Sequence, residues 1–472
     1  MPQPPNILWL CTDQQRFDTI ASLGNSQIRT PNIDQLVDEG VAFTQAYCQS
    51  PVCTPSRASF LTGRYARTTR CRQNGQTIPS DEVLVSKMFA DAGYRCGLAG
   101  KLHLASCSEG KPEVRIDDGY HDFRWSHHPQ PDWPENAYTQ WLHAKGQTWD
   151  DLYSGASTGY VMEGVPTEYH QTTWCAEMTM DFIRGNLGRP WFFSFNCFDP
   201  HHAFDPPPDY MAKYNPADMP LPKHRPGELS SKTTFQQLDS EWAHNSPGEF
   251  HTGAMTDDDR RQVTAAYYAM CELIDDQVGR IMKTLEETGQ RDNTIVIFMS
   301  DHGEMLGDHG LYFKGPHFYD EAIRVPLVVS WPERFQSGLR ISGLTELIDI
   351  VPTLLESAGL EIPQRIQGRS LVPHLAGEAD PQQHRDSVFC EYYNSWTHSD
   401  AYGTMLRTNT EKIVVYHGSD QGELYDLAAD PDEFVNLWHS DSHTDMKMRL
   451  MKQCFDASVL SMDPLPPRRG AF

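Results

Sequence analysis

The chain has 472 residues, of which 39% are hydrophobic, and its 21 Phe, 19 Tyr and 11 Trp supply many large apolar side chains. This length and composition predict one large folded domain with a smaller second one, and enough apolar side chains for a substantial core. A formal net charge of −25 argues against nucleic acid or an anionic membrane as a partner, because like charges repel.

Two further classes of protein are not expected. No stretch approaches the ~20 consecutive apolar residues that a membrane helix needs. Residues 1–5 (MPQPP) lack the basic and apolar segments of a secretory signal, and the 11 cysteines form an odd number without the spacing of a disulfide framework. These features predict reduced thiols and a cytoplasmic location.

Strands and helices are predicted to alternate along the first 380 residues. Short apolar runs predict buried strands at 6–11, 95–99, 191–196, 294–299 and 325–330. Apolar periodicity and end signals predict helices at 31–40, 83–93, 257–287 and 344–358, the longest of them capped by Thr256. The alternation predicts an α/β fold with a mostly parallel central sheet and helices on both faces.

The character of the sequence changes near Pro381. Segments 387–393, 402–407 and 412–416 are predicted to be antiparallel strands, and 444–455 a closing helix. We therefore expect an α/β domain over residues 1–380 and a C-terminal α+β subdomain with an antiparallel sheet over 381–472. The Pro-rich segment 206–250 is predicted to shape the mouth of a binding site, because compact domains rarely keep a long irregular segment without a use.

The most informative segment is 53–64, CTPSRASFLTGR. Cys53 followed by Pro55, Arg57 and the run Leu61-Thr62-Gly63-Arg64 resembles the signature of type I sulfatases, in the alkaline-phosphatase-like superfamily. In that family the cysteine is oxidised after synthesis to formylglycine, whose hydrated aldehyde is the nucleophile. The resemblance thus implies a formylglycine-generating enzyme as a partner. Without the resemblance, the same residues describe a loop cysteine ahead of a helix that starts near Pro55.

Acidic residues follow the first and fourth predicted strands. Asp13 comes after the first, and Asp301 and His302 after the fourth. Ligands collect beyond the carboxyl ends of parallel strands, so these groups are candidates for a hard-cation site. The resemblance implies one divalent cation held by Asp13, Gln14, Asp301, His302 and the modified Cys53. The family usually binds Ca²⁺, so Ca²⁺ is expected. Many relatives carry Asp-Asp where this chain has Asp13-Gln14, which removes one negative charge from the site and leaves Mn²⁺ open.

Cationic groups and imidazoles follow the other predicted strands. Lys101 and His103 come after strand 95–99, His201 after strand 191–196, and Lys314 after the fourth strand. The resemblance implies that these four bind the sulfate oxygens, orient the formylglycine or protonate the leaving group, and that Arg57 holds the formylglycine in place. Such a set would meet the negative charge that builds up as the S–O bond breaks.

Substrate contacts are harder to predict. Asn74 matches a position where relatives place an active-site amide, but Asn74-Gly75 is equally a common turn pair. His317 lies in a loop predicted to face the pocket. Trp125, Trp133 and Trp141 could stack on a sugar ring or enclose a cation, or they could belong to the core.

The sequence therefore predicts a sulfuric ester hydrolase acting on a carbohydrate or small alkyl or aryl sulfate, with a carbohydrate sulfate slightly preferred. The metal-site residues also resemble the choline sulfatase and phosphonate monoester hydrolase branches, so a phosphonate monoester or phosphodiester hydrolase is the first alternative. Phosphonate relatives carry Tyr and Thr where this chain has Lys101 and His103, which favours sulfate. A non-catalytic, metal-binding relative is the second alternative.

Overall fold

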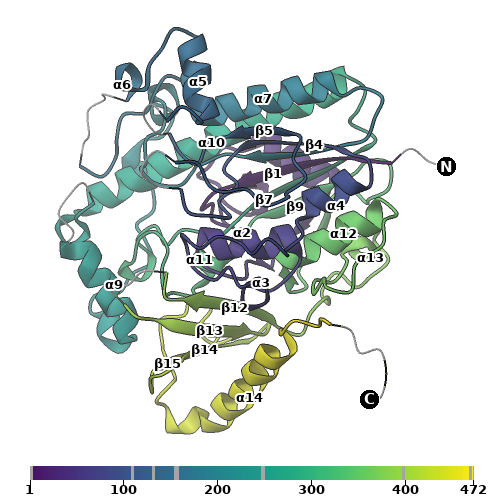
Figure 1. Ribbon diagram of the computed structural model, residues 1–472. Coiled ribbons are helices and arrows are strands. Elements are labelled where there is room, and N and C mark those ends of the chain that lie inside the picture. The colour runs from purple at the N-terminus through teal and green to yellow at the C-terminus, as the bar shows by residue number, and fades with distance from the viewer. Residues whose placement is uncertain are drawn as a thin grey trace.

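An eight-stranded sheet runs through the centre of the protein in the order β10-β2-β9-β7-β1-β6-β4-β5 (Figure 1). The computed structural model describes residues 4–107, 111–129, 133–153, 159–245, 250–395, 399–466 and 470. The strands of this sheet are β1 (Asn6–Thr12), β2 (Val41–Phe43), β4 (Arg95–Gly100), β5 (Asp122–Trp125), β6 (Trp191–Asn196), β7 (Thr294–Ser300), β9 (Leu327–Ser330) and β10 (Leu339–Ile341).

Five neighbouring strands of this sheet, β7, β1, β6, β4 and β5, are parallel. Thr12 of β1 pairs with Ser300 of β7, and Asn196 of β6 pairs with both Cys11 and Gly100. Because the ends of these strands are in register, the segments that follow them leave the sheet at the same edge. Strand β9 is antiparallel to both of its neighbours, β7 and β2, and β10 is parallel to β2, so β9 alone of these eight strands runs in the opposite direction.

Both faces of the sheet are buried under helices, as predicted. The helices of the whole structure are α1 (Pro31–Glu39), α2 (Cys53–Thr62), α3 (Ala66–Thr69), α4 (Val85–Asp91), α5 (Ala137–Ala144), α6 (Trp149–Leu152), α7 (Gln171–Gly185), α8 (Pro208–Met211), α9 (Thr234–Asn245), α10 (Asp257–Glu287), α11 (Asp320–Ile323), α12 (Ile350–Ser357), α13 (Val372–Leu375) and α14 (Thr444–Leu460). A hydrophobic core lies on each face of the sheet, and alternate residues of β1 point into one or the other. Leu8 and Leu10 pack with α1, α7 and α10, whereas Ile7 and Trp9 pack with α2, α4 and α12. Figure 1 shows α7 and α10 on one side of the sheet and α2, α4 and α12 on the other.

Most predicted elements are confirmed within two residues, and the longest helix has the predicted bounds. Its cap, Thr256, forms a reciprocal pair of hydrogen bonds with Asp259. The closing helix α14 begins at the predicted residue but extends five residues beyond its predicted end, to Leu460. Two predictions were wrong. The strand expected at 325–330 is divided at Pro326 into β8 (Arg324–Val325) and β9, because proline lacks the N–H that a continuous ladder requires. The helix expected at 344–358 is helical only from Leu347, after the short strand β11 (Thr345–Glu346).

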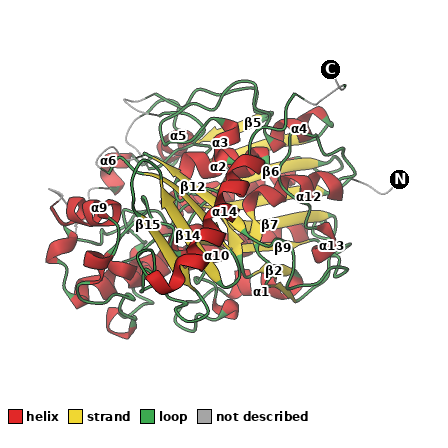
Figure 2. Cartoon of the chain, turned by 90° about the horizontal axis from the view of Figure 1, so that it is seen from below, coloured by secondary structure: helices red, strands yellow, loops and turns green. Residues whose placement is uncertain are grey.

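A second, antiparallel sheet lies at one end of the molecule with α14 across it (Figures 1 and 2). Its strands are β12 (Val388–Tyr393), β13 (Tyr402–Arg407), β14 (Glu411–Tyr416) and β15 (Gly422–Asp426). One face packs on α14 through Leu406, Ile413 and Leu450, and the other joins the main core through Met405 and Val414. A third sheet has the order β11-β3 (Ala46–Tyr47)-β8. Among the described residues no helix is long and apolar enough to span a bilayer.

A buried lysine lies where the C-terminal antiparallel sheet meets the part of the protein built on the eight-stranded sheet. Lys412 of β14 is fully buried, and its Nζ donates to Phe318 O (2.9 Å), Asp320 Oδ1 (3.0 Å) and Glu433 Oε2 (2.8 Å). Burial opposes ionisation of Asp320, but Arg407 and Lys412 lower the pKa of that carboxyl far below its usual value. Lys412 thus ties the C-terminal sheet to the segment that carries α11.

Replacing Lys412 with Met should therefore destabilise the protein by about 3–5 kcal/mol, because Asp320 and Glu433 would keep buried negative charges without their shared partner. Urea denaturation measures this loss. The matched control is Lys452→Met, which removes an exposed i,i+4 pair with Asp456 and should cost no more than about 0.5 kcal/mol. A loss below about 1 kcal/mol for Lys412→Met would show that the junction does not depend on this lysine.

Candidate active site

Helix α2 begins at Cys53, directly at the edge where the parallel strands end. Every residue of α2 is buried, and Cys53 is 1% exposed. Asn74 Oδ1 accepts a hydrogen bond from the Thr54 N–H (2.9 Å), and Ser56 Oγ donates to the carbonyl of Asp301 (2.6 Å). These bonds fix the first turn of α2 against the end of β7, and the helix N-terminus adds partial positive charge beside Cys53.

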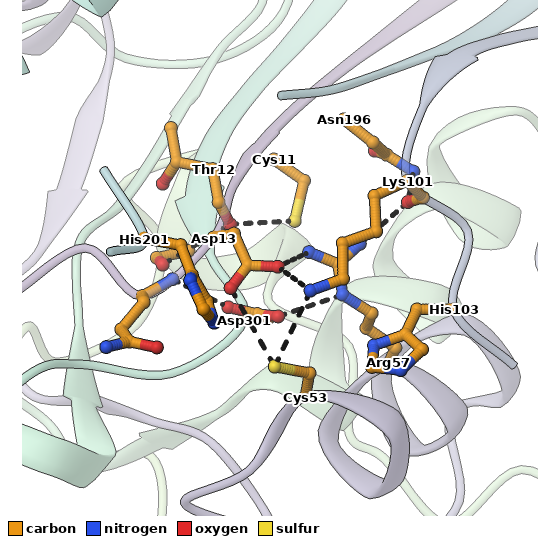
Figure 3. A network of polar contacts seen from close by, with 12 residues as sticks. Cys11, Thr12, Asp13, Cys53, Arg57, Lys101, His103, Asn196, His201 and Asp301 are labelled. Carbon is orange, nitrogen blue, oxygen red and sulfur yellow. Dashed lines mark hydrogen bonds and ion pairs between the residues drawn. The ribbon is translucent and has the colours of Figure 1, made fainter. Parts of the chain in front are cut away.

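The thiol of Cys53 lies among charged groups from three strand ends (Figure 3). Its Sγ is 3.1 Å from His302 Nε2, 3.7 Å from Lys101 Nζ and 3.8 Å from Asp13 Oδ1. Burial and Asp13 oppose ionisation, but Lys101, Lys314 and His302 together lower the pKa of the thiol. Cys53 is thus in the kind of electropositive surroundings that make a cysteine reactive.

Arg57, one turn along α2, connects the two carboxylates beside Cys53. Its guanidinium donates to Asp301 Oδ2 (2.8 Å), to Asp13 Oδ2 (3.0 Å) and to the Lys101 carbonyl (2.8 Å). Lys101 Nζ adds an ion pair to Asp13 Oδ2 at 2.6 Å. Burial opposes ionisation of Asp13, but Lys101 and Arg57 hold the pKa of that carboxyl well below its usual range. The Asp13 carboxylate is therefore fixed as an anion in a closed cluster.

Four side chains of this cluster could hold a metal ion. One ligand atom from each of Asp13, Cys53, Asp301 and His302 lies within 4.8 Å of the others, and all four residues are buried. The Nδ1 of His302 donates to the carbonyl of Gly303 (2.9 Å), so Nε2 is the ring nitrogen that faces the cluster. Burial opposes protonation of this ring, but Asp301 and Cys53 raise the pKa of His302 to about 9, so Nε2 would have to release its proton to bind a cation. Two carboxylates, an imidazole nitrogen and the group at position 53 suit a divalent cation.

The amide of Gln14 is oriented by a carboxylate that the sequence did not predict. Glu304 Oε2 accepts from Gln14 Nε2, while Oε1 accepts from the N–H groups of Leu306 and Phe313. Gln14 Oε1 therefore faces Lys314, whose Nζ donates to it. Glu304 follows directly after Asp301-His302-Gly303, but nothing in the sequence distinguishes this carboxylate from an ordinary turn residue.

Lys314 also contacts His201, which follows β6. The two nitrogens, Lys314 Nζ and His201 Nε2, are 2.6 Å apart. His201 Nδ1 donates to the carbonyl of His202, so Nε2 accepts from the lysine and the ring is neutral. Burial, followed by Lys314, lowers the pKa of His201 well below its usual value.

Lys101 enters the cluster because β4 and β6 approach closely at Gly100. This glycine has φ of 107°, and a Cβ there would lie 1.9 Å from the Asn196 carbonyl oxygen. His103 lies two residues after Lys101. The carboxylate of Glu113 accepts hydrogen bonds from the backbone N–H groups of His103 (2.8 Å) and Leu104 (2.7 Å). Burial, followed by Lys101, lowers the pKa of His103 well below its usual value. Glu113 was not predicted from the sequence either.

The structure brings most of the predicted site residues together. Asn74 joins them through its contact with the first turn of α2. His317 does not. It is fully buried, and its Nε2 lies 3.1 Å from Asp239 Oδ2 on α9. The residues that meet around the edge of the sheet are Asp13, Gln14, Cys53, Arg57, Asn74, Lys101, His103, His201, Asp301, His302 and Lys314.

The three candidate tryptophans have different surroundings. Trp125 is buried, and its Nε1 donates to Glu113 (2.8 Å). Trp133 is partly exposed and stacks on Trp125 with ring centroids 6.3 Å apart. Trp141 packs within α5 against Tyr138. Of the three, Trp133 alone combines a contact near the site with partial exposure.

Most of the chain matches the models of known protein families. Residues 5–360 match the model of the sulfatase family, and residues 307–459 match that of the C-terminal part of N-sulphoglucosamine sulphohydrolase. The first match covers the large sheet and all residues of the cluster, and the second covers the antiparallel sheet.

Individual relatives agree over nearly the whole chain. An N-acetylglucosamine-6-O-sulfatase of Bacteroides thetaiotaomicron is 26% identical, with 95% of this chain and 85% of the relative covered. An arylsulfatase of Clostridium perfringens is 29% identical, with 93% and 91% covered. The structure of a phosphonate monoester hydrolase from Silicibacter pomeroyi superposes with a TM-score of 0.86 at 26% identity, covering 97% of this chain and 96% of that one.

Proposed function

The chain belongs to the sulfatase family and is a sulfuric ester hydrolase, and we propose that it cleaves sulfate monoesters at the buried cluster around Cys53. The observation that carries the proposal is the position of Cys53. Its Sγ lies 3.1 Å from an imidazole and 3.7 Å from a lysine, at the edge where the five parallel strands end. A buried thiol surrounded by charged groups suits a catalytic role, because perturbed nucleophiles collect at functional sites.

Two groups that the family uses fit the residues present. Conversion of Cys53 to formylglycine by a maturation enzyme would supply a hydrated aldehyde, whose two hydroxyls allow attack on the ester and later release of sulfate. Asp13, Asp301 and His302, with the group at position 53, would hold one divalent cation, which lowers the pKa of a bound hydroxyl and neutralises negative charge when present. We propose the amide oxygen of Gln14, which here accepts a hydrogen bond from Lys314, as a further ligand. With one amide in place of a carboxylate and one imidazole in the set, we keep Ca²⁺ and Mn²⁺ as the candidates.

The cationic side chains account for the binding of an anion by a protein of net charge −25. Lys101 and Lys314 are both almost fully buried, and both act on Cys53 electrostatically. We assign them to the non-bridging oxygens of the ester, where preorganised positive charge is most effective in a site that excludes water. Arg57 is engaged with both carboxylates, so we assign it to positioning rather than to the sulfate.

The two neutral imidazoles are assigned to proton transfer. His103 and His201 lie beside Lys101 and Lys314 respectively, and the pKa of each is lowered well below its usual value, first by burial. A neutral imidazole can accept a proton from the attacking hydroxyl, and the imidazolium so formed can return it to the leaving oxygen. The hydrolysis consumes one water and yields an alcohol or phenol and sulfate.

Sulfated saccharides and aryl sulfates are the substrates we propose, because the named relatives include an N-acetylglucosamine-6-O-sulfatase and an arylsulfatase. A phosphonate monoester hydrolase is the second candidate, favoured by the close superposition on one such enzyme. Both ester types present an anionic group that would lie against the same lysines, so some turnover of each is expected.

The test combines mass spectrometry with a rate comparison. Protein coexpressed with a formylglycine-generating enzyme should contain an aldehyde in the Cys53 peptide and should hydrolyse phenyl sulfate faster than phenyl phenylphosphonate. An unmodified thiol under every expression condition would remove the proposed nucleophile. Faster turnover of the phosphonate would reverse the order of the two candidate functions.

A further inference from the structure

A row of partly exposed rings borders the cluster on the side that solvent can reach. It consists of Trp133, His128, Phe198, His201, His202 and Phe313, and we call it the aromatic wall. Successive ring centroids are 6.4, 5.7, 4.5, 4.1 and 4.0 Å apart, so the contacts are continuous from Trp133 to Phe313. The six residues come from three separate segments of the chain, after β5, after β6 and after β7.

The aromatic wall touches the two lysines that we assign to the ester oxygens. Lys101 Nζ lies 5.3 Å from the Phe198 ring centroid, and Lys314 Nζ lies 2.6 Å from His201 Nε2. By contrast, the Cys53 side of the cluster is closed by α2, which is buried throughout. An ester whose oxygens contact both lysines must therefore extend its remaining part along the partly exposed rings.

The chemistry of the wall favours a neutral partner. Burial, followed by Lys101, lowers the pKa of His128 to about 4, and burial lowers that of its neighbour His127 well below the usual value. Near neutral pH these rings are uncharged, so they offer faces for stacking and little attraction for an anion. A cationic group would be repelled by Lys101, which already faces the ring of Phe198.

We infer that the aromatic wall is the leaving-group subsite of this enzyme, and that it selects esters whose leaving group is an uncharged ring lying face-on against Phe198 and His128. An aryl group and the C–H face of a pyranose share this chemistry. The inference rests on the proposed function, since it assumes that the ester oxygens lie against Lys101 and Lys314. It assigns specificity to His128 and Trp133, which lie outside the charged cluster.

The test uses His128→Ala and Trp133→Ala and measures kcat/KM for phenyl sulfate, N-acetylglucosamine 6-sulfate, methyl sulfate and choline sulfate. Each variant should lower the phenyl-to-methyl ratio about 3- to 10-fold relative to wild type, since ring stacking contributes roughly 0.5–1.5 kcal/mol. Comparing variant with wild type cancels the different intrinsic reactivity of the two esters. The matched control is Trp242→Ala, a half-exposed tryptophan on α9 outside the wall, which should leave the ratio unchanged.

Comparing N-acetylglucosamine 6-sulfate with phenyl sulfate distinguishes a sugar ring from an aryl ring as the preferred leaving group. An equal loss for phenyl sulfate and N-acetylglucosamine 6-sulfate indicates a general ring subsite, and a loss confined to one names the natural leaving group. An unchanged ratio in both variants, or a larger loss for choline sulfate than for either ring ester, overturns the inference.

A binding measurement separates this inference from the proposed function. Calorimetry on Cys53→Ala protein compares phenyl sulfate with methyl sulfate without requiring turnover, and the ring ester should bind more tightly only while His128 and Trp133 are present. If wild-type protein hydrolyses no sulfate ester, the proposed function fails. The difference in binding between the two esters still shows whether the aromatic wall binds a ring. Equal binding of the two esters by Cys53→Ala protein overturns the subsite.

Discussion

Replacing Cys53 with Ala should lower kcat/KM for phenyl sulfate by at least about 10⁴-fold, the largest effect that we expect from any single substitution. The reason is that no other described side chain at the cluster combines a nucleophilic atom with the position of Sγ, 3.1 Å from His302 Nε2 and 3.7 Å from Lys101 Nζ. Steady-state kinetics on fully matured wild-type and variant protein measures the ratio. A loss below about 10-fold would mean that the chemistry does not pass through position 53.

Two comparisons show that such a loss is chemical and not structural. Ala is a good helix former and Cys53 is the first residue of α2, so the variant should keep the melting temperature of the wild type to within a few degrees. Cys53→Ser is the second comparison. Its single hydroxyl can attack the ester but cannot restore the starting group, so one equivalent of phenol should appear and turnover should then stop.

The sequence predicts the frame of this site well because buried parallel strands leave a strong signal. The runs NILWLC and TIVIFM are typical of strands buried on both faces, and after each run an aspartate follows a single hydroxyl residue. Since the structure sets β1 and β7 side by side in register, Asp13 and Asp301 are placed together by the pairing of Thr12 with Ser300 alone. A motif at the end of a confirmed strand is thus located as soon as the order of the strands is known.

The positioning residues could not be predicted, because their roles depend on contacts between segments far apart in the chain. Glu304 acts on Gln14 across 290 residues, and Glu113 holds a turn whose shape no local pattern encodes. Each is a single carboxylate that in sequence looks like a solvated residue. His317 shows the converse, since a loop histidine expected at the pocket is buried against Asp239.

The segment 344–358 shows how tertiary contacts override a local pattern. Its apolar spacing predicts one helix, but Thr345 and Glu346 instead pair with Ala46 and Tyr47 of β3. The carboxylate of Glu346 is then held by Tyr65, at 2.7 Å, and by Arg385, at 3.0 Å. Helix propensity is a weak preference, and these long-range bonds outweigh it.

Removing divalent cations with a chelator should abolish activity, with a fall of at least about 10³-fold, and adding back Mn²⁺ or Ca²⁺ should restore it. A second readout does not depend on catalysis. Asp13 and Asp301 are buried carboxylates that share Arg57, and Asp13 also pairs with Lys101. A cation bound between them should stabilise the folded state by about 2.7 kcal/mol at one hundred times its Kd. The melting temperature should therefore rise with cation concentration.

The Asp301→Asn variant should lose most of this rise, because it removes one of the two carboxylates, whereas Asp456→Asn on the exposed side of α14 should keep it. The ion that produces the larger rise at equal concentration is the one that the site prefers. If wild-type protein shows neither a loss of activity on chelation nor a change in melting temperature on adding either ion, then the four side chains around Cys53 form a closed ion-pair cluster. Arg57, Lys101 and Lys314 would then have to supply all of the positive charge that the reaction needs.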